Sequence, residues 1–314
     1  MNPRQKFEWL MAGIATLLAV ATVVGWILGA KVRTESGRSV IANLNTRIAA
    51  WWVMVAVFGV AYVFGKIATI VLFAVISFLS LREFITLTPT RPADHRALSV
   101  AFFVIIPVQY YLIGIEWYAL FTIFIPVYAF LLLPSLSMLG QDTEQFLERT
   151  AKIQWGVFVT VFCISHAPAL LLLRIPGYAG QDALLLFYLI LIVQISDVLQ
   201  YVFGKLFGKH PVASVVSPSK TVEGLVGGAS SAIGVGCAMW WITPFSPVQA
   251  AAMASVIVLA GFLGGLVLSA VKRSMGAKDW GSMISGHGGM LDRMDSISFA
   301  APIFFHLTRF FFAH

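Results

Sequence analysis

Long apolar runs separated by short polar segments dominate the chain. Ten apolar windows fall at about 8–30, 48–65, 67–81, 97–114, 117–138, 153–173, 183–203, 225–242, 248–271 and 296–313. Because a membrane-spanning helix needs about 20 mostly apolar residues, the pattern predicts an all-α, polytopic integral membrane protein with about ten spans. The second and third windows abut at Gly65-Lys66. A tight hairpin there keeps ten spans, whereas one bent element would leave nine.

Composition supports a membrane location. Of the 314 residues, 59% are hydrophobic and 11% are charged, whereas soluble domains carry about 25% charged residues. A soluble enzyme, a disordered chain and a secreted disulfide scaffold are therefore excluded. Cys163 and Cys237 lie in apolar runs, which predicts small buried side chains and neither a disulfide nor a metal site.

The basic residues are distributed unevenly between the predicted loops. With ten spans, sixteen of the 21 Lys and Arg residues fall on the side that holds the loops after spans 1, 3, 5, 7 and 9. The positive-inside rule makes that side cytoplasmic and puts both termini outside, although Arg4 and Lys6 count against an external N-terminus. The net charge of +7 suits anionic lipid or a polyphosphate substrate, and we expect no nucleic-acid partner.

The first chemically informative loop is predicted over 196–228. It contains Ser217, Lys220 and Thr221, followed by glycines, just before the next span. Lysine, hydroxyl groups and closely approached backbone N–H groups at a helix start are what a polyphosphate requires. The alternative is a basic, membrane-flanking loop with ordinary helix caps.

The second loop, 269–296, concentrates charge. Three of the chain's 14 acidic residues lie there among four basic ones. Carboxylates beside cations suit Mg²⁺ with a phosphate-rich substrate, because Mg²⁺ takes one or two carboxylates, water and substrate oxygens. The alternative is a solvated loop with internal ion pairs.

These two loops carry a family resemblance. The segments Ser269–Arg273, Lys278–Gly281 and Ile284–Asp295 resemble, at every constrained position and spacing, the signature of the phosphatidate cytidylyltransferase (CDP-diacylglycerol synthase) family. The run Ser217-Pro218-x-Lys220-Thr221-x-Glu223-Gly224 resembles a second block of that family. The match covers roughly 197–296. We therefore divide the chain into transmembrane helices over 1–195 and a catalytic transmembrane region over 196–314.

The resemblance implies an activity and its partners. The expected reaction transfers CMP from CTP to phosphatidate, giving CDP-diacylglycerol and pyrophosphate, with Mg²⁺ as cofactor. The expected location is a bacterial inner membrane, with the active site facing the cytoplasm and a homodimer possible.

The resemblance and the chemistry together suggest residue roles. Metal ligation is expected of Asp279 and Asp292, with Asp295 as a third ligand and Asp197 for a second cation. CTP phosphates are expected at Ser217, Lys220 and Thr221, and close substrate approach at Gly288 and Gly289. Pyrophosphate and lipid phosphate are expected to be shared among Lys272, Arg273 and Lys278.

Three roles stay open at this point. Arg293 is either a phosphate clamp or the partner of an aspartate. His287 contacts phosphate, donates a proton or serves a turn. Glu223 fits a helix start better than a ligand, because an acid there is favourable for the helix dipole.

One departure from the family leaves the acceptor lipid open. Family members often have Ala before the tyrosine that matches Tyr201, whereas this chain has Gln200. A cytidylyltransferase acting on another lipid phosphate is therefore an alternative. A transporter with a basic cytoplasmic vestibule is a second alternative, although transporters place ionisable residues inside their spans, and most charges here lie at span ends.

Overall fold

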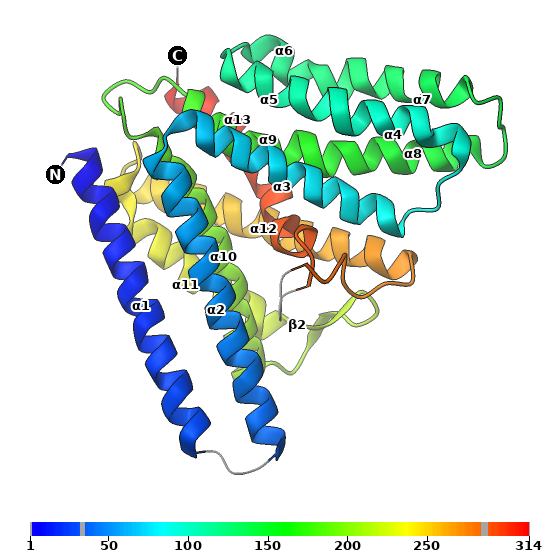
Figure 1. The fold of residues 1–314 in the computed structure, drawn as a ribbon. Coiled ribbons are helices and arrows are strands. Elements are labelled where there is room, and N and C mark those ends of the chain that lie inside the picture. Colours follow the sequence, from blue (N-terminus) through cyan, green and yellow to red (C-terminus); the bar gives the residue numbers. More distant parts are fainter. Residues whose placement is uncertain (1, 32–34, 284–287, 314) are drawn as a thin grey trace.

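The computed structural model describes residues 2–31, 35–283 and 288–313, with backbone alone at a few positions between 35 and 47. Eight of its helical segments are long and apolar enough to cross a membrane. Each of the ten predicted windows coincides with helix to within a few residues. The all-α, polytopic membrane fold is thus confirmed (Figure 1).

Helices of the N-terminal part are often joined end to end by π or 3-10 turns. The elements are α1 (Pro3–Lys31), α2 (Glu35–Val63), α3 (Lys66–Leu87), η1 (Pro92–Asp94), α4 (His95–Val100), η2 (Ala101–Ile105), α5 (Ile106–Gly114), α6 (Tyr118–Ile123), η3 (Phe124–Ala129), α7 (Phe130–Met138), α8 (Phe146–Val157), η4 (Phe158–Cys163), α9 (Ile164–Ala169) and η5 (Leu170–Leu172). Continuous candidate spans result over Pro92–Gly114, Tyr118–Met138 and Phe146–Leu172.

The C-terminal part contains longer helices and one small hairpin. Its elements are α10 (Asp182–Phe207), β1 (Pro211–Ala213), β2 (Ser217–Thr221), α11 (Val222–Ala238), η6 (Trp240–Ile242), α12 (Pro247–Ser274) and α13 (Leu291–Phe312). Of these, α11 is apolar but has 17 residues, and α10 and α12 are among the eight candidate spans.

The junction of the second and third windows is a hairpin. Helix α2 ends at Val63 and α3 begins at Lys66, with Gly65 at φ +85° between them. This left-handed conformation suits glycine, which has no Cβ to clash. The single bent element is therefore excluded.

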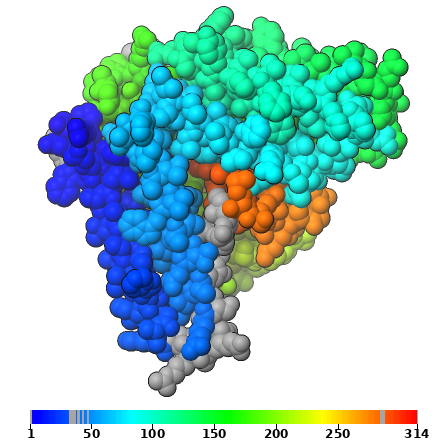
Figure 2. Space-filling view, viewed as in Figure 1, coloured from blue at the N-terminus to red at the C-terminus, as the bar shows by residue number. Residues whose placement is uncertain are grey.

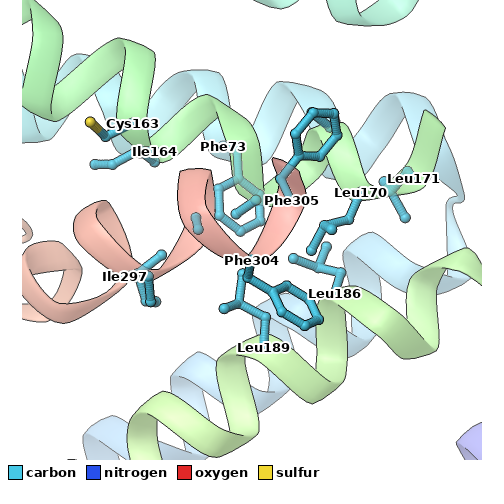
Figure 3. Packing of buried hydrophobic residues seen from close by; sticks show 14 of the residues in the cluster. Phe73, Cys163, Ile164, Leu170, Leu171, Leu186, Leu189, Ile297, Phe304 and Phe305 are labelled. Atoms are coloured by element: carbon cyan, nitrogen blue, oxygen red, sulfur yellow. The ribbon is translucent and has the colours of Figure 1, made fainter. Parts of the chain in front are cut away.

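Helix α13 is enclosed by elements from both parts of the chain. Phe304 and Phe305 are almost fully buried, and Figure 3 shows Phe304 beside Leu186 and Leu189 of α10. One apolar cluster extends from Phe7 to Phe305. The predicted boundary at 195/196 falls inside α10. The two parts therefore share this helix, and they also share one apolar core.

Helices α10 and α11 approach each other along a stripe of small residues. The buried positions of α11 are Gly224, Gly228, Ala232 and Gly236, which recur every four residues and so share one face. Small residues at this spacing let two backbones come close. A Cβ added at Gly228 would lie 2.6 Å from the Cα of Gln200.

Both predicted loops are shorter in the structure. Helix α10 continues to Phe207 and α11 begins at Val222, so Asp197 lies on a helix and 208–221 is the connection. This connection contains the antiparallel pair β1–β2, which the hydropathy pattern did not predict. Helix α12 likewise continues to Ser274, and α13 begins at Leu291. Polar side chains near the ends of these spans were interpreted as loop, whereas α10 continues through Gly204 and Lys205 to Phe207.

Two further groups of charged side chains form ion pairs elsewhere in the chain. Glu116 bonds to Lys66 and Arg174, whose hydrogen bonds hold the pKa of that carboxyl below its usual value. The buried Arg149 guanidinium lies 3.0 Å from Asp94. These pairs tie neighbouring elements together and are well separated in sequence from the two chemically informative loops.

The glycine stripe makes a testable prediction. We expect Gly228→Ala to destabilise the protein by about 1–3 kcal/mol, because the new methyl group must displace the backbone of α10. Gly234→Ala is the matched control, since a Cβ there meets nothing within 4 Å. Thermal denaturation in detergent compares the two. Equal stability of both variants would show that the α10–α11 contact is not tight at Gly228.

Candidate active site

The carboxylate of Asp292, in the first turn of α13, accepts three hydrogen bonds from residues that the structure describes. Its Oδ1 accepts from the Nζ of Lys272 at 2.6 Å. Its Oδ2 accepts from the backbone N–H of Trp280 at 2.8 Å and of Gly289 at 2.9 Å. Both side chains of the ion pair are at least nine-tenths buried. Asp292 therefore joins the end of α12, the segment after it and the start of α13.

The two glycines before α13 are needed for this geometry. Gly288 has φ +80°, which favours glycine. A Cβ at Gly289 would lie 2.7 Å from the carboxyl carbon of Glu83. At each of these glycines, the space that a Cβ would occupy is filled by a carboxylate of the chain itself: that of Asp292 at Gly288 and that of Glu83 at Gly289.

Glu83 of α3 is a site residue that the sequence reasoning missed. It is buried, and its two oxygens accept the backbone N–H groups of Met290 and Leu291, each at 2.8 Å. An acid next to Arg82 in an apolar run was the available signal. A single acid at a span end does not reveal its distant partner.

An apolar contact accompanies this polar one. The Phe84 ring lies 5.3 Å from the Trp280 ring, centroid to centroid. Leu268 and Leu291 join the same small buried cluster. Figure 2 shows the orange residues at the end of α12 and after it directly against the light-blue and cyan surface that includes α3. The signature segment is thus seated on the N-terminal part of the chain.

A second polar cluster lies among α10, β2, α12 and α13. Asp295, Lys220 and Arg293 all act electrostatically on Asp197. The Nζ of Lys220 lies near Gly265 of α12, and its charge is 4.9 Å from the centroid of Phe262. The structure therefore brings together Asp197 and Lys220 from the first predicted loop with Arg293 and Asp295 from the second.

The number of carboxylates in this cluster is compatible with a magnesium site. Within the described residues, no group of three or more His, Cys, Asp and Glu side chains is arranged to hold a metal. Asp197 and Asp295 act electrostatically on each other, and one or two carboxylates are enough for Mg²⁺ when substrate phosphates and water complete the shell. Asp292, by contrast, already accepts three hydrogen bonds.

Other predicted residues are more peripheral. Arg273, Lys278 and Asp279 are exposed, and Ser217 is half-buried on β2. Thr221 caps α11 by accepting the N–H of Gly224 at 3.1 Å, so a helix-cap role is confirmed there. His287 lies outside the described residues.

Two further side chains have clear structural partners. Glu223, in the first turn of α11, accepts the backbone N–H groups of Lys209 and His210, which agrees with its interpretation as a helix-start residue. The amide of Gln200 donates to the Oγ of Ser196 at 2.7 Å. Gln200 also lies against Gly228, where α10 and α11 approach each other closely.

Comparison with known proteins identifies the family of this chain. The sequence model of the cytidylyltransferase family matches residues 45–311, which include both polar clusters and Glu83. The chain belongs to the cytidylyltransferase family. It is accordingly a nucleotidyltransferase, and its expected substrates are CTP and a phosphate-bearing lipid.

Relatives of this cytidylyltransferase divide into two kinds. The "Uncharacterized protein YnbB" of Escherichia coli (strain K12) is 37% identical, over 96% of this chain and 98% of that protein. Phosphatidate cytidylyltransferase of Staphylococcus aureus (strain COL) is 42% identical over 118 residues, and that of Staphylococcus saprophyticus is 43% identical over 115 residues. These two matches cover 37% and 36% of this chain, and 45% and 44% of the relatives.

The neighbouring cations Lys272 and Arg273 allow a matched test of the buried pair. We expect Lys272→Met to destabilise the cytidylyltransferase by about 3–5 kcal/mol, because Asp292 would stay buried without its counter-charge. Arg273→Met should have little effect on stability, since Arg273 is exposed and its side-chain hydrogen bond among the described residues is a 3.4 Å bond to Ala277. Unfolding midpoints in detergent distinguish the two; equal losses would contradict the assigned difference.

Proposed function

We propose that this cytidylyltransferase transfers CMP from CTP to phosphatidate, which gives CDP-diacylglycerol and pyrophosphate. The observation that carries the proposal is the meeting of the two motif blocks. The Nζ of Lys220, from the first block, and the Oγ of Ser296, directly after the second block, lie 2.7 Å and 3.6 Å from the Cβ position of Gly265 on α12, although the two blocks are far apart in sequence. The named phosphatidate cytidylyltransferases add support over the shorter region that they match.

The reaction requires little proton transfer. A non-bridging oxygen of the lipid phosphate attacks the α-phosphorus of CTP, the bond from that phosphorus to the bridging oxygen breaks, and pyrophosphate leaves with the electron pair. A phosphate monoester has a second pKa of about 6, so the nucleophile is mostly a dianion at neutral pH. The barrier then lies in bringing anions together and in the charge that develops on pyrophosphate.

The residues of the two clusters have the charges to meet that barrier. Lys220 and Arg293 would hold phosphate oxygens and orient the α-phosphorus toward the acceptor. Asp197 and Asp295 would hold Mg²⁺, which supplies further neutralisation of phosphate charge when bound. Lys272 would stay paired with Asp292 and fix the start of α13. Arg273 and Lys278, which are exposed, would attract the anionic substrates.

The membrane arrangement follows from charge. The positive-inside distribution of the basic residues supports a cytoplasmic active site. CTP would then arrive from the cytoplasm, and the lipid phosphate from the adjoining leaflet. Because the relatives named above come from bacteria, we infer a bacterial inner membrane for this protein.

The acceptor lipid is the least constrained part of the proposal. The relative that matches along nearly its whole length is uncharacterised, and the match to a named phosphatidate cytidylyltransferase covers 37% of this chain. A lipid phosphate other than phosphatidate is therefore the second candidate. It would leave the nucleotide chemistry unchanged.

The experiment is a product assay with the full-length protein in detergent. Labelled CTP and Mg²⁺ are incubated with phosphatidate, an ether-linked analogue or a polyprenyl phosphate, and lipid products are identified by mass spectrometry. We expect a CMP-labelled lipid and one pyrophosphate per turnover, both lost on chelation of Mg²⁺. A product from another lipid alone would overturn phosphatidate as the acceptor. No pyrophosphate with any lipid phosphate would overturn the activity.

A pair of lysines tests the site in the same assay. We expect Lys220→Met to lower kcat by about 10²–10³, because a preorganised positive group is removed from the developing charge. Lys205→Met is the matched control: this lysine is exposed and lies 5.9 Å from the centroid of Tyr201. Similar kcat values for the two variants would remove Lys220 from the site.

A further inference from the structure

Glu83 occupies an unusual position for an acid in this chain. It lies one turn before the end of α3, in the N-terminal part, and its side chain is buried. More than 200 residues separate it from its two hydrogen-bond donors, Met290 and Leu291. A buried carboxylate is costly unless its oxygens are satisfied, so this placement depends on the start of α13.

The contact is the kind that fixes a helix end. The first N–H groups of an α-helix have no partner inside the helix and carry the positive end of its dipole. Glu83 accepts from Leu291, the first residue of α13, and from Met290 before it. Charge-assisted hydrogen bonds of this type are stronger than neutral ones. A second carboxylate, Asp292, takes the N–H of Gly289.

The surrounding backbone is shaped to receive this carboxylate. A Cβ at Gly281 would lie 2.9 Å from the Oε1 of Glu83, and one at Gly289 would also collide with the carboxylate. Two glycines within the signature, Gly281 and Gly289, thus leave space that Glu83 fills. Next to it, Phe84 packs against Trp280, so the same end of α3 holds the segment by a polar and an apolar contact.

We propose that Glu83 is a positioning residue for the reaction, acting through α13. It takes up N–H groups that an anion would otherwise find at the start of α13, which leaves substrate phosphates to Lys220 and Arg293. By fixing the first turn of α13 it also fixes the direction of Asp292 and, one turn later, of Asp295. The catalytic consequence rests on the proposed function, whereas the hold on α13 does not.

The test compares isosteric and shortened variants in the full-length protein. Glu83→Gln keeps the size but offers an N–H₂ group to one of two N–H donors, and Glu83→Asp keeps the charge but shortens the reach. Glu148→Gln is the matched control, because Glu148 is exposed and, among the described residues, its ion pair is with Lys152, four residues away. Each variant is assayed for kcat, for the KM of CTP, for thermal stability and for backbone hydrogen exchange.

We expect a local effect from Glu83→Gln. The amides of peptide 288–296 should exchange about tenfold faster or more, while peptides from α10 and α12 keep wild-type rates. With the proposed reaction, kcat should fall about ten- to hundredfold and the KM of CTP should change less than about threefold. Glu83→Asp should recover part of the lost kcat. Glu148→Gln should match the wild type in every measurement.

Two results would overturn the inference. If Glu83→Gln keeps wild-type exchange in 288–296, Glu83 does not hold the start of α13. If exchange rises but kcat per folded molecule is unchanged, the contact is structural and Glu83 does not position the reaction. Should the wild-type protein transfer no CMP to any lipid phosphate, the proposed function and the catalytic consequence both fail. The exchange measurement then still decides whether Glu83 holds α13.

Discussion

The start of α13 is held by two buried carboxylates, and the active-site arrangement depends on that constraint. Asp292 gathers Lys272, Trp280 and Gly289, while Glu83 gathers Met290 and Leu291. Burial makes each of these bonds consequential, because an unsatisfied charge in such a place would be expensive. These bonds join the end of α3, the end of α12, the segment around Trp280 and the start of α13. Asp295, one turn further along α13, belongs to the second cluster.

Small residues make the close approaches possible. Gly228 and its neighbours every four residues along α11 bring that helix against α10. This contact sets the position of β2, and hence of Lys220. At the other cluster, Gly281 and Gly289 leave the space that Glu83 occupies. Gly289, which was expected to allow close approach of the substrate, thus also makes room for a carboxylate of the protein itself.

The two clusters have different electrostatic character. Lys272 and Asp292 neutralise each other in a buried pair. Two carboxylates, Asp197 and Asp295, lie near Lys220 and Arg293. Under the proposed function these two cations would hold substrate phosphates and the two carboxylates a divalent ion, while the Lys272–Asp292 pair would hold the fold. Membership of the cytidylyltransferase family is compatible with that division.

The sequence by itself determined the membrane class, the helical windows and the motif that places the chain among cytidylyltransferases, because hydropathy and motif spacing are local properties. Asp197, Lys220, Arg293 and Asp295, which come from two separate motif blocks, lie together in the fold, while Thr221 caps a helix and Arg273 is exposed. Their roles toward the substrates stay predictions. Only the tertiary structure decided that Asp292 is paired with Lys272 and that Glu83 holds α13. Such contacts join residues far apart in sequence, so no local pattern contains them.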